Sequence, residues 1–303
     1  MNQKILITPT SLCSNPKLIE SLKEYAELDF KPRQIPEDLS KYTIIILGNE
    51  KLREKELDRA ENLELIARYG IGMDEINTNY AKQKGIVVKN TPGVASNSIA
   101  EYTMAAIYHV TKKMNAIDKK TSTNLNSFIF DDIEGKTLGI IGMGDIGKEI
   151  AKKAKGNDMQ INAYNRTQYK EFYKNHDIKP TNLNELLSTS DFISINIELT
   201  KQTKYLLNET NIHLIKKTAY VINTARADII QPEPFYNALK QNKIAGAILD
   251  VYQENQCFET LTNTILTPHI SSRSQRTTNK KIQMIQNIIK EHIENRKNTK
   301  KYQ

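Results

Sequence analysis

The sequence is poor in cysteine and has no long apolar run. Only two of its 303 residues are cysteines, Cys13 and Cys257, which is too few for a disulfide framework. No apolar run approaches the roughly 20 residues that a membrane-spanning helix needs. The first residues, MNQKILITPTSL, lack the basic region and apolar core of a signal peptide. We therefore expect a cytoplasmic protein without a membrane partner.

The motifs of two common enzyme classes are missing as well. The chain has no closely spaced cysteine pair and no His-x-x-x-His, so no metal site is predicted. It also has no Gly-x-Ser-x-Gly stretch, which carries the nucleophile of an α/β hydrolase. If the chain is an enzyme, its chemistry must come from another source.

Positive charge is in excess, with 43 Lys and Arg against 35 Asp and Glu and a net charge of +8. A nucleic-acid binder would show a basic stripe with interleaved aromatics, whereas these lysines are scattered apart from a basic tail at 293–303. We expect no nucleic-acid partner. Attraction of an anionic substrate or cofactor and plain surface lysines both remain open explanations.

Short apolar runs alternate with helical patterns along the chain. Four runs in the first part have the β-branched character of buried strands: KILITPT, YTIIILGN, LELIARYG and GIVVKNTPG. Residues 16–28 and 74–84 have helical character between them. Such alternation predicts a parallel sheet with helices on both faces, so residues 1–95 form one α/β unit.

A turn-rich break at 90–97 precedes a long, broadly apolar helix predicted over 98–114. Ser98 and Glu101 have the spacing of a capping box at its start. A second alternation follows, with strands expected at 160–165, 192–197, 219–224, 244–251 and 263–268. From Ser271 the pattern returns to helix. We therefore predict a first domain of residues 1–95 plus 271–303 and a second of residues 96–270.

A glycine-rich corner opens the second domain. A predicted strand over 137–141 ends at Gly142, and Gly144 and Gly147 follow before a helix. The first glycine allows a tight turn, the second leaves room for a pyrophosphate, and the third lets helix and strand pack closely. The free N–H groups at the helix start favour phosphates. Strand, turn and helix in this order predict dinucleotide binding; a glycine turn without a ligand is the alternative.

The next predicted strand ends at Asn165, where an acid usually meets the adenosine ribose. Asn165 is uncharged, and Arg166 and Thr167 follow it directly. A cation and a hydroxyl donor suit a 2′-phosphate. We therefore expect NAD(P)(H) binding with a preference for NADP(H), unless Arg166 is a plain surface residue.

Taken together, the long motifs resemble the D-isomer-specific 2-hydroxyacid dehydrogenases, in particular phosphoglycerate dehydrogenase and the hydroxypyruvate/glyoxylate reductases. The resemblance extends over residues 1–290 and is carried by RYGIGMDEINTNYAKQKGIVVKNTPGVASNSIAE, GKTLGIIGMGDIGKEIAKKAKG, SDFISINIELTKQTKYLLN, VINTARADII, IAGAILDVYQEN and NTILTPHIS. It implies two Rossmann-like domains with parallel sheets, an active site in the cleft between them, and a homodimer.

The resemblance also implies a set of catalytic residues. His269 is the expected acid/base, and Arg226 is expected to hold the carboxylate and carbonyl of a 2-keto acid. A carboxylate should pair with the imidazole, but here the chain departs from the family. Glu254 stands one residue early, and Asn255 occupies the usual place of the Glu. We expect Glu254 to face His269, with Asn255 as the alternative.

Further contacts follow from the resemblance, each with a structural alternative. Asp250 is expected at the nicotinamide carboxamide, or else as a strand-end turn former. The remaining cofactor contacts are expected from the backbone of Asp145, Ile146, Thr224 and Ala225. In the first domain the amides of Ile71 and Gly72 are expected to bind the substrate carboxylate. Arg68 would suit a phosphate or second acidic group, if it is not a simple surface charge.

These expectations predict an NAD(P)-dependent D-2-hydroxyacid dehydrogenase. It would transfer a hydride to C2 of a keto acid like hydroxypyruvate, glyoxylate or the product of phosphoglycerate oxidation. The alternative is a dinucleotide-binding regulator or corepressor-like protein with little catalysis. Only the irregular stretch at Glu254 and Asn255 favours the alternative, and the presence of both Arg226 and His269 argues against it.

Overall fold

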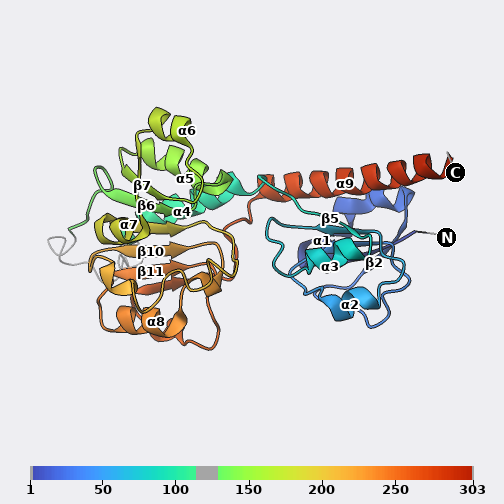
Figure 1. Ribbon diagram of the computed structural model, residues 1–303, viewed down its shortest axis with the longest axis horizontal. Coiled ribbons are helices and arrows are strands. Elements are labelled where there is room, and N and C mark those ends of the chain that lie inside the picture. Colours follow the sequence, from blue (N-terminus) through green and yellow to red (C-terminus); the bar gives the residue numbers. More distant parts are fainter. Residues whose placement is uncertain (1–2, 114–128, 302–303) are drawn as a thin grey trace, which may run out of the picture. The chain divides into compact units, whose positions relative to one another are not determined.

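The chain folds into two compact units, each built on a parallel sheet (Figure 1). The computed structural model describes residues 3–113 and 129–301, without the side chains of 297–301. The first unit is Met1–Val94 with Ser274–Gln303, and the second is Ala95–Arg273. These boundaries differ by one and three residues from those expected from the sequence. None of the described helices is long and apolar enough to cross a membrane.

The first unit has a five-stranded sheet in the order β2-β1-β3-β4-β5, with every pairing parallel. Its strands are β1 (Lys4–Ile7), β2 (Glu27–Phe30), β3 (Ile44–Leu47), β4 (Leu65–Arg68) and β5 (Val87–Lys89). Its helices are α1 (Thr10–Cys13), η1 (Pro16–Glu24), α2 (Glu54–Asp58), α3 (Thr78–Gln83) and α9 (Gln275–Lys301). Both faces of the sheet are covered, which explains why its strands are apolar on both sides.

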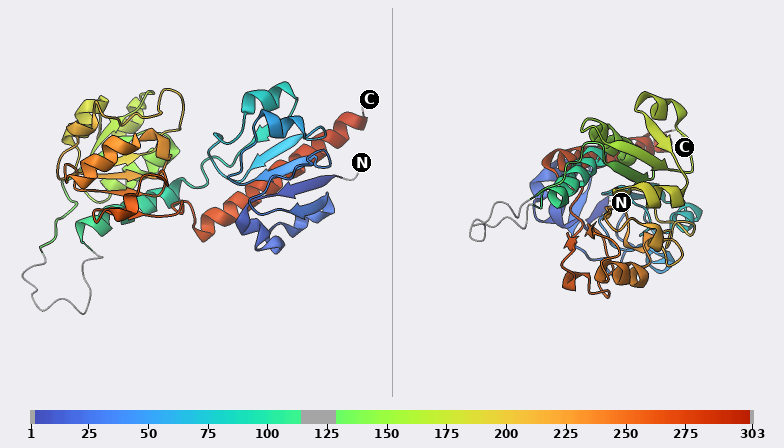
Figure 2. Two further views of the ribbon diagram at one scale, coloured as in Figure 1. Left: turned by 90° about the horizontal axis from the view of Figure 1, so that it is seen from below. Right: turned by 90° about the vertical axis from the view of Figure 1, so that its left-hand side faces the viewer.

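Side chains alternate across this sheet as the strand period requires. Ile5 and Ile7 share a buried cluster with Ile285 and Ile289 of α9, and the left view of Figure 2 shows α9 running along the strands. Leu6, between the two isoleucines, lies in the opposite cluster, which contains Leu57, Ala81 and other residues of the α2 and α3 side.

The helix expected over 16–28 is partly wrong. Pro16–Glu24 forms a 3-10 helix with non-helical backbone angles at Ile19, and Glu27–Phe30 is the edge strand β2. The N–H and C=O groups of this stretch find partners on β1, so pairing in the sheet overrides a pattern that resembles a helix.

The second unit has a seven-stranded parallel sheet in the order β12-β11-β10-β9-β6-β7-β8. Its strands are β6 (Thr137–Ile141), β7 (Gln160–Tyr164), β8 (Ile178–Pro180), β9 (Phe192–Ile195), β10 (Tyr220–Asn223), β11 (Gly246–Leu249) and β12 (Thr264–Leu266). Its helices are α4 (Ser96–Thr111), α5 (Asp145–Lys155), α6 (Lys170–Asn175), α7 (Leu183–Thr189), η4 (Ile212–Leu214), η5 (Ala227–Ile229), α8 (Pro232–Lys240) and η6 (Phe258–Thr260). The predicted α/β fold of two Rossmann-like units is confirmed.

Helix α4 begins two residues earlier than expected, so the predicted capping box is wrong. Its N-cap is Ala95, without a side-chain cap. Ser98 therefore lies inside the first turn, and its hydroxyl donates 3.0 Å to the carbonyl oxygen of Ser271. Glu101 accepts a hydrogen bond from Asn97 instead. The serine thus joins the helix to the segment that follows β12.

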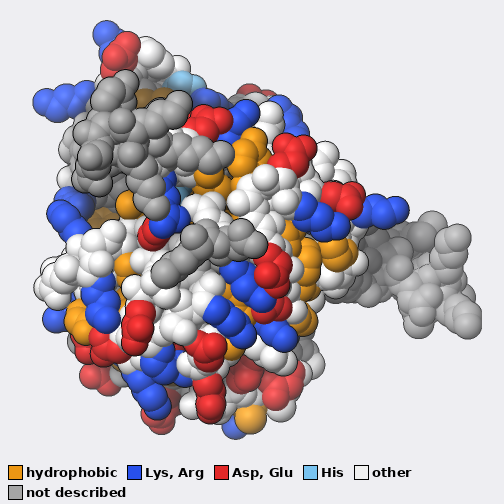
Figure 3. All heavy atoms as spheres, turned by 90° about the vertical axis from the view of Figure 1, so that its right-hand side faces the viewer, with side chains coloured by type: hydrophobic (Ala, Val, Ile, Leu, Met, Phe, Trp, Pro, Cys, Tyr) orange, Lys and Arg blue, Asp and Glu red, His pale blue; other side chains and the backbone are white. Residues whose placement is uncertain are grey.

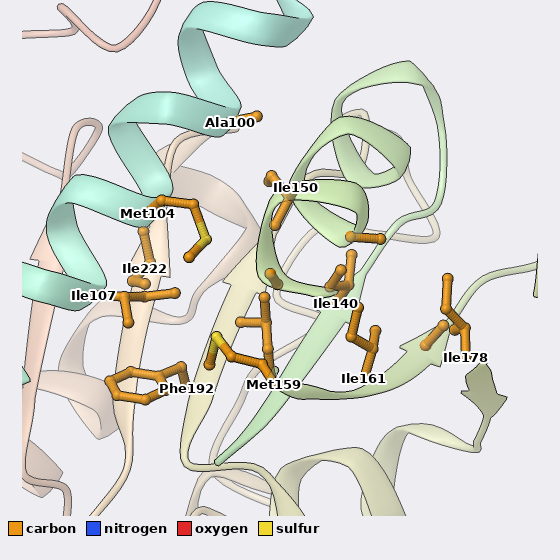
Figure 4. Packing of buried hydrophobic residues seen from close by; sticks show 14 of the residues in the cluster. Ala100, Met104, Ile107, Ile140, Ile150, Met159, Ile161, Ile178, Phe192 and Ile222 are labelled. Atoms are coloured by element: carbon orange, nitrogen blue, oxygen red, sulfur yellow. The ribbon is translucent and has the colours of Figure 1, made fainter. Parts of the chain in front are cut away.

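One face of the second sheet is covered by α4 and α5 (Figure 4). Met104 and Ile107 of α4 pack into the same cluster as Ile140 of β6 and Ile150 of α5. Helices α7 and α8 cover the other face, where Leu186 and Phe235 are fully buried. Because both faces are apolar, only the ends of the strands are left to carry polar groups.

The first and third glycines of the corner after β6 are required by close packing. Gly142 has φ of +99°, a left-handed conformation that favours glycine, and a Cβ there would lie 2.8 Å from the carbonyl oxygen of Asn196. A Cβ on Gly147 would overlap the carbonyl oxygen of Gly142. Helix α5 can therefore approach β6 only because position 147 has no side chain.

Gly147→Ala should destabilise the second unit by about 2 kcal/mol, since the overlapping atom is backbone and cannot move aside cheaply. We expect the midpoint of its thermal unfolding in calorimetry to fall by roughly 4–8 °C. The matched control is Gly156→Ala at the end of the same helix. There the backbone is helical, and a Cβ would lie 3.4 Å from its nearest neighbour, the carbonyl oxygen of Lys153. Equal midpoints for the two variants would contradict this account.

Candidate functional site

The polar groups of the second unit collect at the carboxyl edge of its sheet. In the order β12-β11-β10-β9-β6-β7-β8, the chain reverses its direction of winding between β6 and β9. Ligands of open α/β sheets bind at such a switch point, beyond the carboxyl ends of the strands. The glycine corner lies there, with the N–H of Gly142 bonded to the carbonyl oxygen of Tyr164 at 2.9 Å.

The middle glycine leaves the space that a pyrophosphate needs. A Cβ on Gly144 would meet no atom within 4 Å, in contrast to the crowded Gly142 and Gly147. Gly144 is also the N-cap of α5, without a side-chain cap in the described structure, so the first N–H groups of the helix point to the open side. Asp145 and Ile146 are the first two residues of that helix. The corner therefore fits a dinucleotide.

Asn165 ties the glycine corner to the end of β7. Its Oδ1 accepts a 3.0 Å hydrogen bond from the N–H of Met143, and its Nδ2 donates 2.6 Å to the carbonyl oxygen of Thr167. Arg166 and Thr167 are exposed beside it. Lys148 adds a second cation to this corner, with its ammonium 3.7 Å from the centre of the Tyr169 ring. Arg166 and Lys148 are thus two cations near the corner, which also contains the carboxylate of Asp145.

Three neighbouring strands bring Arg226, Asp250 and His269 to the same edge. Arg226 lies three residues beyond β10, Asp250 directly follows β11, and His269 lies three residues beyond β12. Backbone hydrogen bonds continue past the strand ends. The N–H of Asp250 bonds to the carbonyl of Asn223, and the N–H of His269 bonds to the carbonyl of Asp250, each at 3.0 Å. The sheet ladder therefore fixes the backbone that carries these side chains.

The turn before Arg226 is held by the buried amide of Asn223. Its Oδ1 accepts from the N–H of Ala225 at 3.0 Å, and its Nδ2 donates 2.9 Å to the carbonyl oxygen of Arg226. Thr224 is buried in the same turn. One guanidinium N–H of Arg226 donates 2.8 Å to the carbonyl of Ala225. This bond helps to orient the guanidinium, which carries five N–H donors.

The backbone of His269 is left-handed, with φ of +54°, which costs a non-glycine residue roughly 1 kcal/mol. The turn is held by Asp250, of which 1% is exposed. Its Oδ1 accepts from the N–H of Ile270 at 2.8 Å and from the hydroxyl of Thr267 at 2.6 Å. Its Oδ2 accepts from the N–H of Ser271 at 2.9 Å. The carboxylate of Asp250 therefore accepts three hydrogen bonds from the protein itself. Its expected contact with the nicotinamide carboxamide stays a prediction.

The irregular stretch after β11 is an exposed turn. Glu254 and Asn255 are both exposed in it, and the preceding Gln253 donates 3.1 Å from its Nε2 to the carboxylate of Asp228. The pairing of His269 with Glu254 stays a prediction.

In the first unit, Arg68 is 3% exposed at the end of β4. Its Nε donates 3.1 Å to the carbonyl oxygen of Gly72, and its Nη2 donates 2.9 Å to Oδ1 of Asn49. The Glu75 carboxylate lies 3.8 Å away. Through its bond to Gly72, the guanidinium holds the loop of residues 69–72 that follows β4. Ile71 and Gly72 are half-buried in that loop, and their role toward a substrate stays a prediction.

Sequence reasoning missed Thr267 and Tyr102. The Tyr102 hydroxyl lies 2.6 Å from that of Thr267, and Thr267 donates to Asp250. Thr267 had a signal, because it stands two residues before His269. Tyr102 had none, since 165 residues separate it from Thr267. Among the described residues no group of three or more His, Cys, Asp or Glu has the arrangement of a metal site.

Comparison with known proteins identifies the family. The family model of the D-isomer specific 2-hydroxyacid dehydrogenase NAD-binding domain matches residues 102–271. A glyoxylate reductase of Thermococcus kodakarensis is 34% identical over 276 residues, covering 84% of this chain and 83% of that protein.

Two solved structures have the same fold over nearly the whole chain. D-lactate dehydrogenase of Aquifex aeolicus, complexed with NAD and lactic acid, is 26% identical with a TM-score of 0.87, covering 97% of this chain and 96% of that one. An acyclic imino acid reductase, in complex with NADPH and D-Arg, is 28% identical with a TM-score of 0.83, covering 92% and 94%. These likenesses do not favour the regulator alternative, and they support a nicotinamide cofactor. The chain belongs to the D-isomer specific 2-hydroxyacid dehydrogenase family and is a hydride-transferring oxidoreductase of 2-hydroxy acids.

Proposed function

We propose that this dehydrogenase reduces small, unphosphorylated 2-keto acids such as glyoxylate, prefers NADPH, and uses Arg226 and His269 as its catalytic residues. The observation that carries the proposal is the continuous backbone ladder from Asn223 through Asp250 to His269. Arg226 follows β10 and His269 follows β12, the two strands that flank β11 in the sheet that also holds the glycine corner.

The chemistry divides between the cofactor and the protein. The nicotinamide cofactor supplies the hydride that adds to C2 of the keto acid. Arg226 binds the substrate carboxylate and carbonyl oxygen through its planar donors and so withdraws charge from C2. The imidazolium of His269 gives a proton to the same oxygen, which becomes the hydroxyl, and takes a proton back from water. In the oxidation direction the neutral imidazole removes that proton.

The preference for an unphosphorylated substrate rests on Arg68. This residue was the cation expected to meet a phosphate, but it donates to Tyr69 and Gly72 in the loop after β4 and to Asn49 beyond the end of β3. A neighbouring carboxylate, Glu75, compensates its charge. Several curated relatives of this chain carry the name glyoxylate reductase, whose substrate has no phosphate.

Wild-type enzyme should oxidise NADPH with glyoxylate or hydroxypyruvate at a kcat/KM at least tenfold above that with 3-phosphohydroxypyruvate. The loss of absorbance at 340 nm measures this across the keto-acid panel with each cofactor. Faster turnover of the phosphorylated acid would contradict the substrate assignment. Cofactor binding without turnover of any keto acid would favour a regulator instead.

The preference for NADPH rests on Arg166 and Thr167, exposed beside Asn165 at the corner. Arg166→Ala should raise the KM for NADPH about tenfold and leave the KM for NADH within twofold, because a lost charge-assisted contact to phosphate is worth about 1.4 kcal/mol. Lys170→Ala, which removes an exposed cation at the start of α6, is the matched control and should change neither KM. Equal effects of Arg166→Ala on both cofactors would refute the assignment.

Glu254 is proposed as the carboxylate that stabilises the protonated imidazole. Glu254→Gln should lower kcat for keto-acid reduction at neutral pH by about tenfold. Because reduction needs the protonated form, the fall of activity with rising pH should begin at a lower pH in this variant. The comparison variant Asn255→Gln keeps an uncharged amide and should retain the wild-type pH profile. A shifted profile in Asn255→Gln alone would give the role to Asn255.

We also propose that the enzyme is a homodimer of the cytoplasm. Tyr108, Ile129 and Phe130 are exposed apolar residues of the second unit, and Ile129 is 81% exposed. Both cysteines are free thiols, which suits a reducing compartment. On the face shown in Figure 3, acidic and basic side chains are mixed, and no nucleic-acid partner is proposed. Sedimentation analysis at micromolar concentration gives the oligomeric state directly.

A further inference from the structure

A chain of hydroxyl groups reaches Asp250 from helix α4. The phenol oxygen of Tyr102 lies 2.6 Å from Oγ1 of Thr267, and Thr267 lies 2.6 Å from Oδ1 of Asp250. Tyr102 and Thr267 are both partly buried, and Asp250 is buried. All three residues belong to the second unit, and neither hydroxyl has a part in the mechanism described above.

The chemistry of the three side chains decides which of them donates in each hydrogen bond. A carboxylate only accepts, so the single hydroxyl hydrogen of Thr267 goes to Asp250. Thr267 then has only lone pairs left for its second partner, and Tyr102 must be the donor. Burial raises the pKa of Tyr102, the hydrogen bond with Thr267 partly opposes this, and the charge of Asp250 adds to the rise, so the phenol keeps its proton at neutral pH. Each bond in such a chain polarises and strengthens the next.

The far end of the chain is the turn that carries His269. Asp250 also binds the N–H groups of Ile270 and Ser271, and its carbonyl binds the N–H of His269. Three consecutive N–H groups are thus held by one residue, and the first of them belongs to a left-handed backbone position. The orientation of the Asp250 carboxylate therefore decides whether the turn keeps this conformation.

We propose that Tyr102 and Thr267 are positioning residues of this enzyme, which fix the Asp250 carboxylate and through it the turn that holds His269. This inference rests on the proposed acid/base role of His269. Reacting groups must be held closely, since a displacement of about 1 Å can cost up to 100-fold in rate. Loss of either hydroxyl should thus affect kcat more than substrate or cofactor binding.

The experiment compares Thr267→Val, Tyr102→Phe, the double variant and Thr267→Ser. We expect Thr267→Val to lower kcat for glyoxylate reduction about tenfold with both KM values within twofold. Tyr102→Phe should lower kcat about threefold. The double variant should be no slower than Thr267→Val, because the phenol acts only through Thr267. Thr267→Ser keeps the hydroxyl and should stay within twofold of wild type.

A second measurement needs neither cofactor nor turnover. Hydrogen exchange of the apo protein reports on the N–H groups of Ile270 and Ser271. Their exchange should become at least tenfold faster in Thr267→Val and stay near wild type in Thr267→Ser. The matched control is Thr264→Val. It removes a partly buried hydroxyl at the start of β12, where the single hydrogen is shared between the carbonyls of Phe258 and Leu261. It should change neither kcat nor exchange at 270 and 271, whatever it does to the melting temperature.

The outcomes separate this inference from the proposed function. Additive losses of kcat in the double variant, or unchanged exchange at 270 and 271 in Thr267→Val, would overturn the positioning role. If His269→Gln keeps full activity, the acid/base role of His269 fails and the kinetic part of the inference with it. The exchange result then still decides whether the two hydroxyls hold the turn.

Discussion

The turn that carries His269 in the second unit depends on the hydrogen bonds of one buried carboxylate, that of Asp250. A charged group removed from water must be compensated by hydrogen bonds, and here the donors are the hydroxyl of Thr267 and the N–H groups of Ile270 and Ser271. These donors come from the segment that carries His269. The requirement to satisfy one carboxylate therefore shapes the turn that presents the imidazole.

The glycine corner after β6 is a second structural feature at the carboxyl edge of the same sheet. Gly142 and Gly147 are required by close packing, whereas Gly144 leaves open space at the start of α5. Asn165 then joins the corner to the end of β7 through two hydrogen bonds. The carboxyl ends of parallel strands lie at one edge, so distant parts of the sequence bring the glycine corner and His269, the proposed acid/base residue, to one sheet.

The sequence predicted the fold and the family well because long motifs carry both. The strands of the second unit are apolar on both sides, and each ends close to where its pattern of apolar residues ends. Predictions from local sequence patterns were wrong where hydrogen bonds to distant residues decided the structure. Glu27–Phe30 joined the sheet beside β1 instead of extending a helix. Ser98 matched a capping box but bonds to Ser271, because the helix starts at Ser96.

The sequence by itself determined the parallel α/β architecture, the glycine corner and the residue types Arg226 and His269, because each depends on local order along the chain. Only the tertiary structure decided which partners the buried polar side chains bind. Arg68 has the sequence context of a ligand-binding cation, yet its guanidinium donates to Tyr69, Gly72 and Asn49 of the same unit. Tyr102 reads as one more apolar position of a helix, yet its hydroxyl meets a residue 165 positions away. A hydrogen bond depends on distance and direction in space, and neither can be obtained from sequence spacing once several strands and helices lie between the partners.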